Sequence, residues 1–339
     1  MKHRRLGKSA IYVSDICMGT MTFGSSADEK MSHKIMDASL DAGINFFDTA
    51  EGYPVPPDKK WVGRTEEIIG KWMKNKDRDS IIIATKVSGP SHIWFQSPKR
   101  AGMTAVDRHN IVKALDDSLK KLQTDYIDLY QMHWPDHGVP YDETMEVLDE
   151  EIRKGKIRAI GCSNETSWGL MKSLETSERL GVARYCTIQN NFSMNNRRFE
   201  DELAQVCQHE GVSLIPYSPL AGGVLSGKYN DGATPKGARW SRYLNMKDTR
   251  QFAMAQRFVN KKSLESTKRF MEIAGEAGIS VVTLATAWSK QHEFVASTIV
   301  GATHTDQLPD IFAAADLELS DDVMKAVDKV TNDIMYPMG

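Results

Sequence analysis

The chain has 339 residues, of which 41% are hydrophobic and 26% are charged, as in globular proteins that can bury a sizeable core. Its 43 Lys and Arg residues against 45 Asp and Glu residues give a net charge of −2. This balance argues against the basic surface needed to bind nucleic acid or an anionic membrane. No apolar run approaches the ~18 residues of a membrane span.

The beginning of the chain is basic, but no apolar segment of the kind found in a secretory signal follows it. The four cysteines stand far apart, with no C-x-x-C pair: Cys17, Cys162, Cys186 and Cys207. Isolated cysteines of this kind are typical of reduced, buried thiols. We therefore expect a cytoplasmic protein without disulfides.

Short β-branched runs alternate with longer amphipathic segments along nearly the whole chain. At the start, residues 4–6 and 12–13 around Gly7 and Lys8 predict a hairpin that plugs the bottom of the fold. The alternation then predicts eight strands, at residues 15–19, 45–49, 81–86, 126–133, 159–163, 185–189, 213–217 and 296–300. Apolar residues at helical spacing predict helices between them, most clearly after Arg64 and after Arg108.

Eight strands, most of them followed by a helix, predict a parallel sheet. Several strands are apolar throughout, as expected when both faces of the sheet are covered. A (β/α)8 TIM barrel, formed as a single domain over residues 1–339, fits this repeat. The alternative is a doubly wound sheet, which the absence of a G-x-G-x-x-G motif after any strand disfavours.

One connection is much longer than the others. Residues 222–263, rich in Gly, Arg, Tyr and Asn, separate the seventh predicted strand from its helix. A connection of this length is usually functional, or it contains small helices of its own.

Polar side chains follow three consecutive predicted strands. The second strand ends at Asp48 with Tyr53 just beyond it, the third ends at Lys86, and the fourth ends at His133. Taken singly, these residues are ordinary caps, packing groups or solvated side chains. In a barrel, however, the carboxyl ends of all strands meet at one rim, where catalytic groups gather. The four residues together therefore predict one site.

The chemistry of these four groups suits carbonyl reduction. A free tyrosine has a pKa of about 10, and a nearby ammonium lowers it. We expect Asp48 to hold Lys86, Lys86 to lower the pKa of Tyr53, and His133 to orient the carbonyl. Tyr53 then acts as general acid. The hydride must come from a cofactor, because no side chain supplies one.

At these residues the sequence resembles the aldo-keto reductase superfamily. The similarity lies in GTMTFG (19–24), DTAEGY (48–53), GRTEEIIG (63–70), TKV (85–87), LQTDYIDLYQMH (122–133) and GKIRAIGCSN (155–164). It covers essentially the whole chain. The segments YPVPP (53–57) and TKVSGP (85–90) are most similar to the bacterial Tas-type branch.

The resemblance implies a barrel that binds NADP(H) across its strand ends. Ser163, Asn164 and Gln189 would hold the nicotinamide carboxamide, and Tyr217 would stack on the ring. The remaining cofactor contacts that it implies are Thr20, Met21, Asp48, Ser218, Pro219, Leu220, Gly222, Lys228, Arg239, Gly301, Thr303, Gln307 and Asp310. Among these, Lys228 and Arg239 would supply positive charge to the phosphates.

The segment after the last strand departs from part of the family pattern. Where many members carry Lys and Arg for the 2′-phosphate, this chain has Gly301 and Gln307, and Ile311 replaces an Asn found in another branch. Thr303, Gln307 and a helix N-terminus are still able to bind a phosphate. We therefore expect NADP(H), with NAD(H) as the alternative.

The substrate is specified less closely. Four aromatic residues are candidates for the mouth of an apolar pocket, which suits an apolar or aromatic aldehyde or ketone; packing on a loop is the other explanation for Phe23, Trp94, Phe95 and Trp134. No metal site is predicted, because the only H-x-x-x-H pair, His133 and His137, straddles Pro135. We expect a small-molecule substrate and a monomer, with a small homo-oligomer as the alternative.

Two other functions compete with reduction. The resemblance includes channel-associated subunits that sense cofactor redox state with little turnover, although those lineages typically alter the histidine that is present here as His133. An isomerase or aldolase would use Lys86 as a Schiff base.

Overall fold

The computed structural model describes residues 1–90 and 97–338. Its main sheet has eight strands in the spatial order β10-β3-β4-β5-β6-β7-β8-β9. Every neighbouring pair is parallel. The strands are β3 (Ile16–Gly19), β4 (Phe46–Asp48), β5 (Ile82–Val87), β6 (Ile127–Met132), β7 (Ile157–Ser163), β8 (Thr187–Gln189), β9 (Ser213–Leu214) and β10 (Thr298–Gly301).

The two outer strands of this order also meet, so that the sheet closes on itself. Leu214 of β9 pairs with Val295. Leu214 N donates to Phe294 O at 2.7 Å, and Ala296 N donates to Leu214 O at 2.9 Å. The structure is therefore a (β/α)8 barrel, as predicted, and the doubly wound alternative is wrong. All eight predicted strands are present, although β9 is shorter than the predicted residues 213–217.

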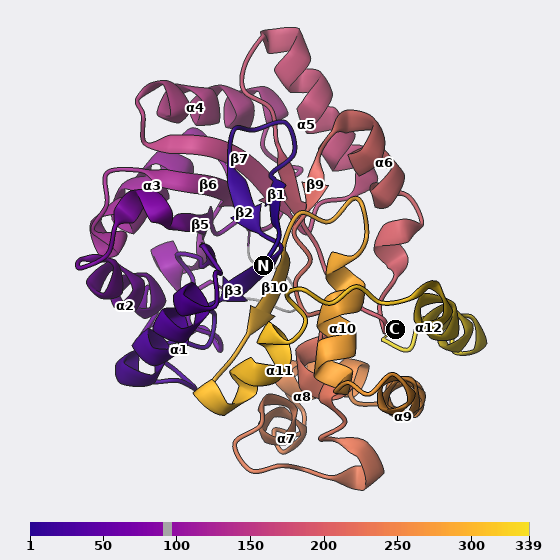
Figure 1. The fold of residues 1–339 in the computed structure, drawn as a ribbon. Coiled ribbons are helices and arrows are strands. Elements are labelled where there is room, and N and C mark those ends of the chain that lie inside the picture. Colours follow the sequence, from indigo (N-terminus) through magenta and orange to yellow (C-terminus); the bar gives the residue numbers. More distant parts are fainter. Residues whose placement is uncertain (91–96, 339) are drawn as a thin grey trace.

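Helices surround the barrel: α1 (Glu29–Asp41), α2 (Arg64–Met73), α3 (Arg108–Leu122), α4 (Tyr141–Arg153), α5 (Ser167–Leu180), α6 (Leu203–Glu210), α7 (Arg239–Leu244), α8 (Arg250–Phe258), α9 (Lys261–Glu276), α10 (Val281–Lys290), α11 (Leu308–Phe312) and α12 (Asp321–Asp333). Figure 1 shows α1 to α6 in succession around the outside of the strands. Local sequence explains where several begin: Asp28 accepts from Met31 N at the start of α1, and Asp107 accepts from Asn110 N at the start of α3.

The core has two parts. The larger part lies between strands and helices and contains the predicted apolar face of α2. The smaller part fills the barrel and includes Phe46 of β4 and Leu129 of β6. Leu6, Ile11 and Val13 belong to it too, because the hairpin of β1 (His3–Arg5) and β2 (Tyr12–Ser14) plugs the N-terminal end of the barrel. The predicted hairpin is thus confirmed.

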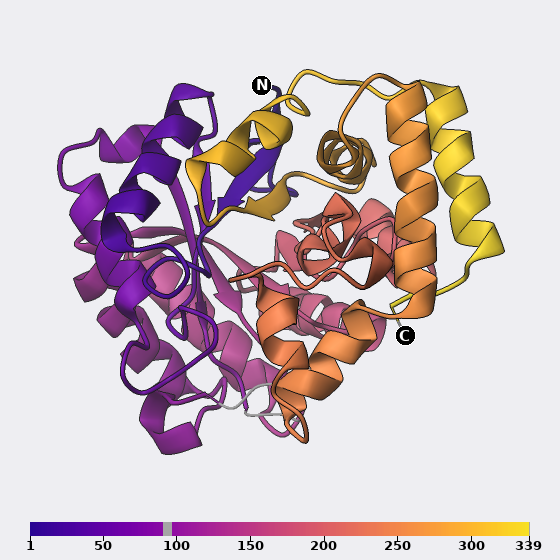
Figure 2. The same cartoon turned by 90° about the horizontal axis from the view of Figure 1, so that it is seen from below.

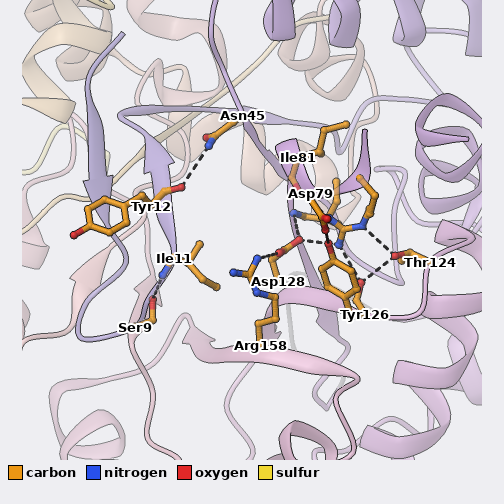
Figure 3. A network of polar contacts seen from close by, with 12 residues as sticks. Ser9, Ile11, Tyr12, Asn45, Asp79, Ile81, Thr124, Tyr126, Asp128 and Arg158 are labelled. Carbon is orange, nitrogen blue, oxygen red and sulfur yellow. Dashed lines mark hydrogen bonds and ion pairs between the residues drawn. The ribbon is translucent and has the colours of Figure 1, made fainter. Parts of the chain in front are cut away.

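A buried carboxylate ties together the strands at this bottom end. Asp128 Oδ2 accepts from Arg78 Nη2 at 2.8 Å and from Ile83 N at 2.9 Å, and Asp128 Oδ1 accepts from Arg158 Nη1 at 2.5 Å. Figure 3 shows Arg158 directed at Asp128, with Tyr126 beside them. Charged groups at the bottom of such a barrel serve stability, because the site forms at the other end.

The long connection after β9 contains the predicted small helices. Besides α7 and α8 it has the short helices η4 (Ala221–Ser226) and η5 (Asn230–Gly232). It lies at the end of the barrel opposite the hairpin (Figure 2). Gly222, at φ 64°, leaves room for Trp240 of α7, because a Cβ at this glycine would lie 2.5 Å from the indole ring. Phe258 of α8 stacks on the same ring, with centroids 4.4 Å apart.

Among the residues described, no single helix is long and apolar enough to cross a membrane. Only α9 and α10 taken together have the required length and hydropathy, and this pair is bent by 93°.

Candidate active site

Asp48 and Lys86 form a buried ion pair at the C-terminal end of the barrel. Asp48 ends β4 opposite Ala84 of β5, and Lys86 follows two residues later, near the end of β5. Lys86 Nζ donates to Asp48 Oδ1 at 2.6 Å and to Thr49 O at 2.7 Å. Burial disfavours the charged amine, but Asp48 and then Tyr53 outweigh it and raise the pKa of Lys86. The amine is therefore held as an ammonium.

Two glutamines occupy the other oxygen of Asp48. Gln189 Nε2, from the end of β8, donates to Asp48 Oδ2 at 2.8 Å, and Gln131 Nε2, from β6, donates at 3.3 Å. A carboxylate only accepts hydrogen bonds, so both amides must present their nitrogen to it. Gln189 Oε1 accepts no bond from any described residue and is not buried. It is therefore available to an N–H donor of a ligand.

Tyr53 lies over Lys86, whose Nζ is 5.1 Å from the centroid of the phenol ring. Its side chain is almost entirely buried. Burial raises the pKa of Tyr53, and Lys86 acts in the opposite direction without overcoming it. Lys86 therefore has the predicted lowering effect on the pKa of Tyr53, but the larger effect of burial was not predicted, because a sequence does not reveal how completely a side chain loses contact with water.

His133 follows β6 and completes the group. Its ring meets the ring of Tyr53 edge-on, with centroids 5.7 Å apart and an interplanar angle of 82°. The half-buried Trp134 stacks beside it at 6.2 Å. The structure thus brings Asp48, Tyr53, Lys86 and His133 together, as the sequence predicted.

Ser163, Asn164 and Tyr217 form the adjoining wall. Asn164, at φ 57°, donates from Nδ2 to His133 O at 2.9 Å and accepts at Oδ1 from the Tyr217 hydroxyl at 2.8 Å. Ser163 Oγ donates to Gln189 O at 2.7 Å. Asn164 therefore connects the end of β7 to the residue after β6 and to the segment after β9.

The connection after β9 is strongly basic. Residues 222–258 contain seven Lys or Arg residues and two Asp residues. None of the seven forms an ion pair with the residues that the structure describes, whereas Asp231 is paired with Lys268. Lys228 reaches over Gly223, where a Cβ would lie 2.9 Å from its amine. Partial desolvation and then the charge of Arg239 lower the pKa of Lys228, and burial lowers that of Arg239.

In the segment after β10, the side chain of Gln307 binds backbone amides of the same segment. Gln307 Oε1 accepts from Thr303 N at 2.7 Å, from Thr303 Oγ1 at 3.3 Å and from His304 N at 3.3 Å. The exposed Asp306 forms an ion pair with His304 at 3.0 Å. Thr303 and Gln307 are thus adjacent, as the prediction of a phosphate site requires, but Gln307 occupies the donors that a phosphate would use.

The other candidate residues have simpler surroundings. Thr20 Oγ1 donates to Asp48 O at 2.8 Å, and Met21 O accepts from Val55 N at 2.9 Å. Phe23 is fully buried in the outer part of the core, so its assignment to the substrate pocket is wrong and its role is packing. Trp94 and Phe95 lie outside the described residues.

Two residues beside the site were missed by sequence reasoning. Gln131 belongs to the inward-facing series of β6, between Leu129 and His133, and a polar residue at such a position was the available signal. Arg100 binds the buried carboxylate of Glu51 through two hydrogen bonds of 2.7 and 3.0 Å. This pair holds the turn that carries Tyr53. Among the described residues, no group of His, Cys, Asp and Glu could hold a metal ion.

Fold and site together define a (β/α)8 barrel with a buried cluster of Asp48, Lys86, Tyr53 and His133 at the C-terminal ends of its strands. The model of the aldo/keto reductase family matches residues 15–332. The chain therefore belongs to the aldo/keto reductase family, which supports an oxidoreductase that uses a nicotinamide cofactor. It is 40% identical to protein tas of Escherichia coli, over 99% of both chains.

Two more distant relatives point in different directions. The chain is 33% identical to the uncharacterized oxidoreductase YrpG of Bacillus subtilis, over 97% of this chain and 96% of that protein. It is 32% identical to a probable voltage-gated potassium channel subunit beta of Arabidopsis thaliana, over 94% and 92% of the two chains.

Proposed function

We propose that the protein is an NADP(H)-dependent reductase that converts an aldehyde or ketone to an alcohol. The observation that carries the proposal is the convergence of Tyr53, Lys86, Asp48 and His133 at one buried level of the barrel. We also propose a cytoplasmic, single-domain protein, which the buried free thiols support.

Each of the four residues has one task in this proposal. Burial keeps the phenol of Tyr53 protonated at neutral pH, so that it is a donor. As negative charge develops on the carbonyl oxygen, Tyr53 donates its proton there, and the ammonium of Lys86 stabilises the phenolate that remains. Asp48 keeps Lys86 charged, and His133 orients the carbonyl oxygen. General acids of this kind contribute about 10²–10⁴ in rate.

The residues around the site fit a nicotinamide dinucleotide. Gln189 Oε1 is available to the N–H of a carboxamide, and Tyr217 offers its ring beside it. The unpaired Lys228 and Arg239, next to Gly222 and its close approach to Trp240, suit a pyrophosphate. The bound cofactor supplies the hydride.

The choice between the two dinucleotides rests on weaker support. The seven cations of residues 222–258, none of which forms an ion pair with a described residue, favour the additional charge of NADP(H). Gln307 opposes it, because a 2′-phosphate must displace this side chain from the amides of Thr303 and His304. NADP(H) is therefore the proposal, with NAD(H) as the alternative. The half-buried Trp134 beside His133 supports an apolar or aromatic carbonyl compound as substrate.

The test is oxidation of NADPH in the presence of 4-nitrobenzaldehyde, followed at 340 nm. Tyr53→Phe is expected to lose about 10²–10⁴ of kcat while it still binds NADPH by fluorescence quenching. Tyr12→Phe is the matched control, because Tyr12 is 58% exposed at the opposite end of the barrel. Full activity of Tyr53→Phe would refute the proposed mechanism.

A regulatory subunit with little turnover is the second candidate, and the relative named as a potassium channel subunit is the observation that favours it. The presence of both Tyr53 and His133 favours an enzyme. A stoichiometric membrane partner in a pull-down, together with negligible turnover of a panel of carbonyl compounds, would reverse this order.

A further inference from the structure

Glu51 is a fully buried carboxylate in the turn between Asp48 and Tyr53. Both of its oxygens accept hydrogen bonds. Glu51 Oε1 accepts from Ser88 N at 2.7 Å and from Arg100 Nη2 at 2.7 Å, and Oε2 accepts from Arg100 Nη1 at 3.0 Å. Bidentate bonds between a guanidinium and a carboxylate are strong and fix the geometry of both groups. No step of the proposed proton transfer uses this carboxylate, although it lies two residues from Tyr53.

Hydrogen bonds join Glu51 to the strand that carries Lys86. Glu51 N donates to Lys86 O at 3.1 Å, and Glu51 Oε1 binds the backbone of Ser88, two residues further on. From the other side, Lys86 Nζ donates to Thr49 O at 2.7 Å. The turn and the end of β5 are thus joined at three points. The backbone at Tyr53 therefore has little freedom to move relative to Lys86.

Arg100 approaches Glu51 from residues 97–104, and only 13% of its side chain is exposed. Its backbone is left-handed, at φ 46°. Residues other than glycine rarely adopt this conformation, and it persists where surrounding contacts hold it. A second contact anchors the same segment to the end of β5, because Thr104 Oγ1 donates to Gly89 O at 2.6 Å. The guanidinium is therefore held in place against the carboxylate.

We propose that Glu51 is a positioning residue, which sets the place of the phenol of Tyr53 above Lys86. Arg100 is the partner that holds its carboxylate. The inference rests on the proposed function, because proton transfer from Tyr53 gives this placement its purpose. Lys86 Nζ lies 5.1 Å from the centroid of the phenol ring, and a misplacement of about 1 Å can lower a rate by about 10²-fold. A carboxylate suits the task because it only accepts hydrogen bonds, whereas a glutamine amide would turn a donor toward the guanidinium.

The experiment measures NADPH oxidation with 4-nitrobenzaldehyde in the double variant Glu51→Gln with Arg100→Met. This variant removes one charge of each sign, so it avoids the unpaired buried charge that either change leaves by itself. At a temperature at which the variant is folded, kcat should fall about tenfold, while the Kd of NADPH changes by less than about twofold. Asp128→Asn is the matched control, because Asp128 is a buried carboxylate bound by arginines at the other end of the barrel. It should lose stability but keep the kcat of wild type.

A second variant separates the charge of Glu51 from its reach. Glu51→Asp keeps a carboxylate opposite Arg100, but it is one methylene too short to bind Ser88 N as well. It should show the same fall in kcat with an unchanged Kd of NADPH. It also replaces the double variant if that protein does not fold.

NMR reports on Tyr53 without turnover. In protein made with tyrosine that carries an NMR-active carbon at Cζ, the Tyr53 resonance is assigned by its loss in Tyr53→Phe. This resonance should shift in the double variant, because the carbon senses the ammonium of Lys86, and it should stay in place in Asp128→Asn.

The outcomes distinguish the inference from the proposed function. A folded double variant with the kcat of wild type, or a Tyr53 resonance that does not move, would overturn the inference and leave the proposed function intact. A wild-type protein that oxidises NADPH with none of a panel of aldehydes would refute the proposed function instead. The Tyr53 resonance then decides about Glu51, because a shift supports the positioning role and its absence refutes it.

Discussion

Asp48→Asn tests the buried ion pair at the centre of the site. The substitution preserves size but removes the charge opposite Lys86, which is fully buried. The chain then has two options: to bury an unpaired ammonium, or to leave Lys86 neutral. pH 7 lies three and a half units below the ordinary lysine pKa of 10.5. At 1.36 kcal/mol per unit, removal of the proton from Lys86 at pH 7 therefore costs about 5 kcal/mol.

This figure is an upper bound for the charge contribution, because the neutral form is always accessible. We therefore expect a loss of about 3–5 kcal/mol at pH 7, in line with other broken buried pairs. At roughly 2 °C per kcal/mol for a chain of this length, Tm should fall by about 6–10 °C. The variant also loses activity, because Lys86 no longer carries a fixed charge below Tyr53.

The sign of the pH dependence follows from the pKa of Lys86 in the folded wild type and in the folded variant. In wild type the pKa of Lys86 is raised, so its contribution is complete below pH 10.5 and is lost only as the pH rises through the folded pKa. In the variant, burial depresses the pKa, so the penalty fades as the pH rises toward 10.5. The stability difference between wild type and variant should shrink by about 1.4 kcal/mol per pH unit, from about 3–5 kcal/mol at pH 7 to about 0.3–2 kcal/mol at pH 9.

Urea unfolding at pH 7, 8 and 9 measures this gap. Asp15→Asn is the matched control, because Asp15 binds Lys290 in another buried pair, at 2.9 Å, remote from the strand ends. It should also lose stability at pH 7 but bind NADPH like wild type. A gap below 1 kcal/mol at pH 7, or one that does not change with pH, would refute the reasoning.

Changes around the site have expected outcomes of their own. Arg239→Met removes a cation beside the glycine turn, so NADPH should bind about tenfold more weakly and with a smaller salt dependence; the exposed Arg242→Met should bind like wild type, and equal effects would contradict this role. Gln307→Arg frees the backbone amides and adds a cation, so NADPH but not NADH should bind about tenfold more tightly in a fluorescence titration; parallel changes for both would contradict it. Arg100→Met leaves the buried carboxylate of Glu51 without its cation, which should cost about 3 kcal/mol in urea unfolding. Adding Glu51→Gln should recover part of that loss, and no recovery would point to lost packing instead.

The barrel could be predicted from the sequence because its strands are marked locally. Runs such as residues 81–85 are apolar on both faces, and each is separated from the next by a helical pattern or a turn. The length of β9 was overestimated: its regular pairing ends at Leu214, and beyond it only single backbone hydrogen bonds remain, such as those from Ile215 N to Ile188 O and from Ile299 N to Pro216 O. Ladder length depends on the neighbouring strand, which the run itself does not encode.

The site was predictable as far as it depends on strand ends. Asp48, Lys86 and His133 end consecutive strands, so topology alone places them together. Gln131 and the raised pKa of Tyr53 were missed, because each depends on groups that only folding assembles: Gln131 meets a carboxylate 83 residues away. Phe23 was misassigned for the same reason, since an aromatic residue near a strand end packs inward or outward according to the helix that covers it.

The short β9 leaves little regular pairing at the seam between β9 and β10. Leu214 forms backbone hydrogen bonds with Phe294 and Ala296 across it, and Ile299 N donates to Pro216 O at 2.9 Å, whereas β5 and β6 share four paired positions. The proposed cofactor contacts at Tyr217 and Gly301 stand on either side of this seam. A dinucleotide that touches both would connect the two sides of this seam in addition to its backbone hydrogen bonds. Backbone amides of residues 213–217 and 296–300 should then show the largest gain in protection from hydrogen exchange when the cofactor binds.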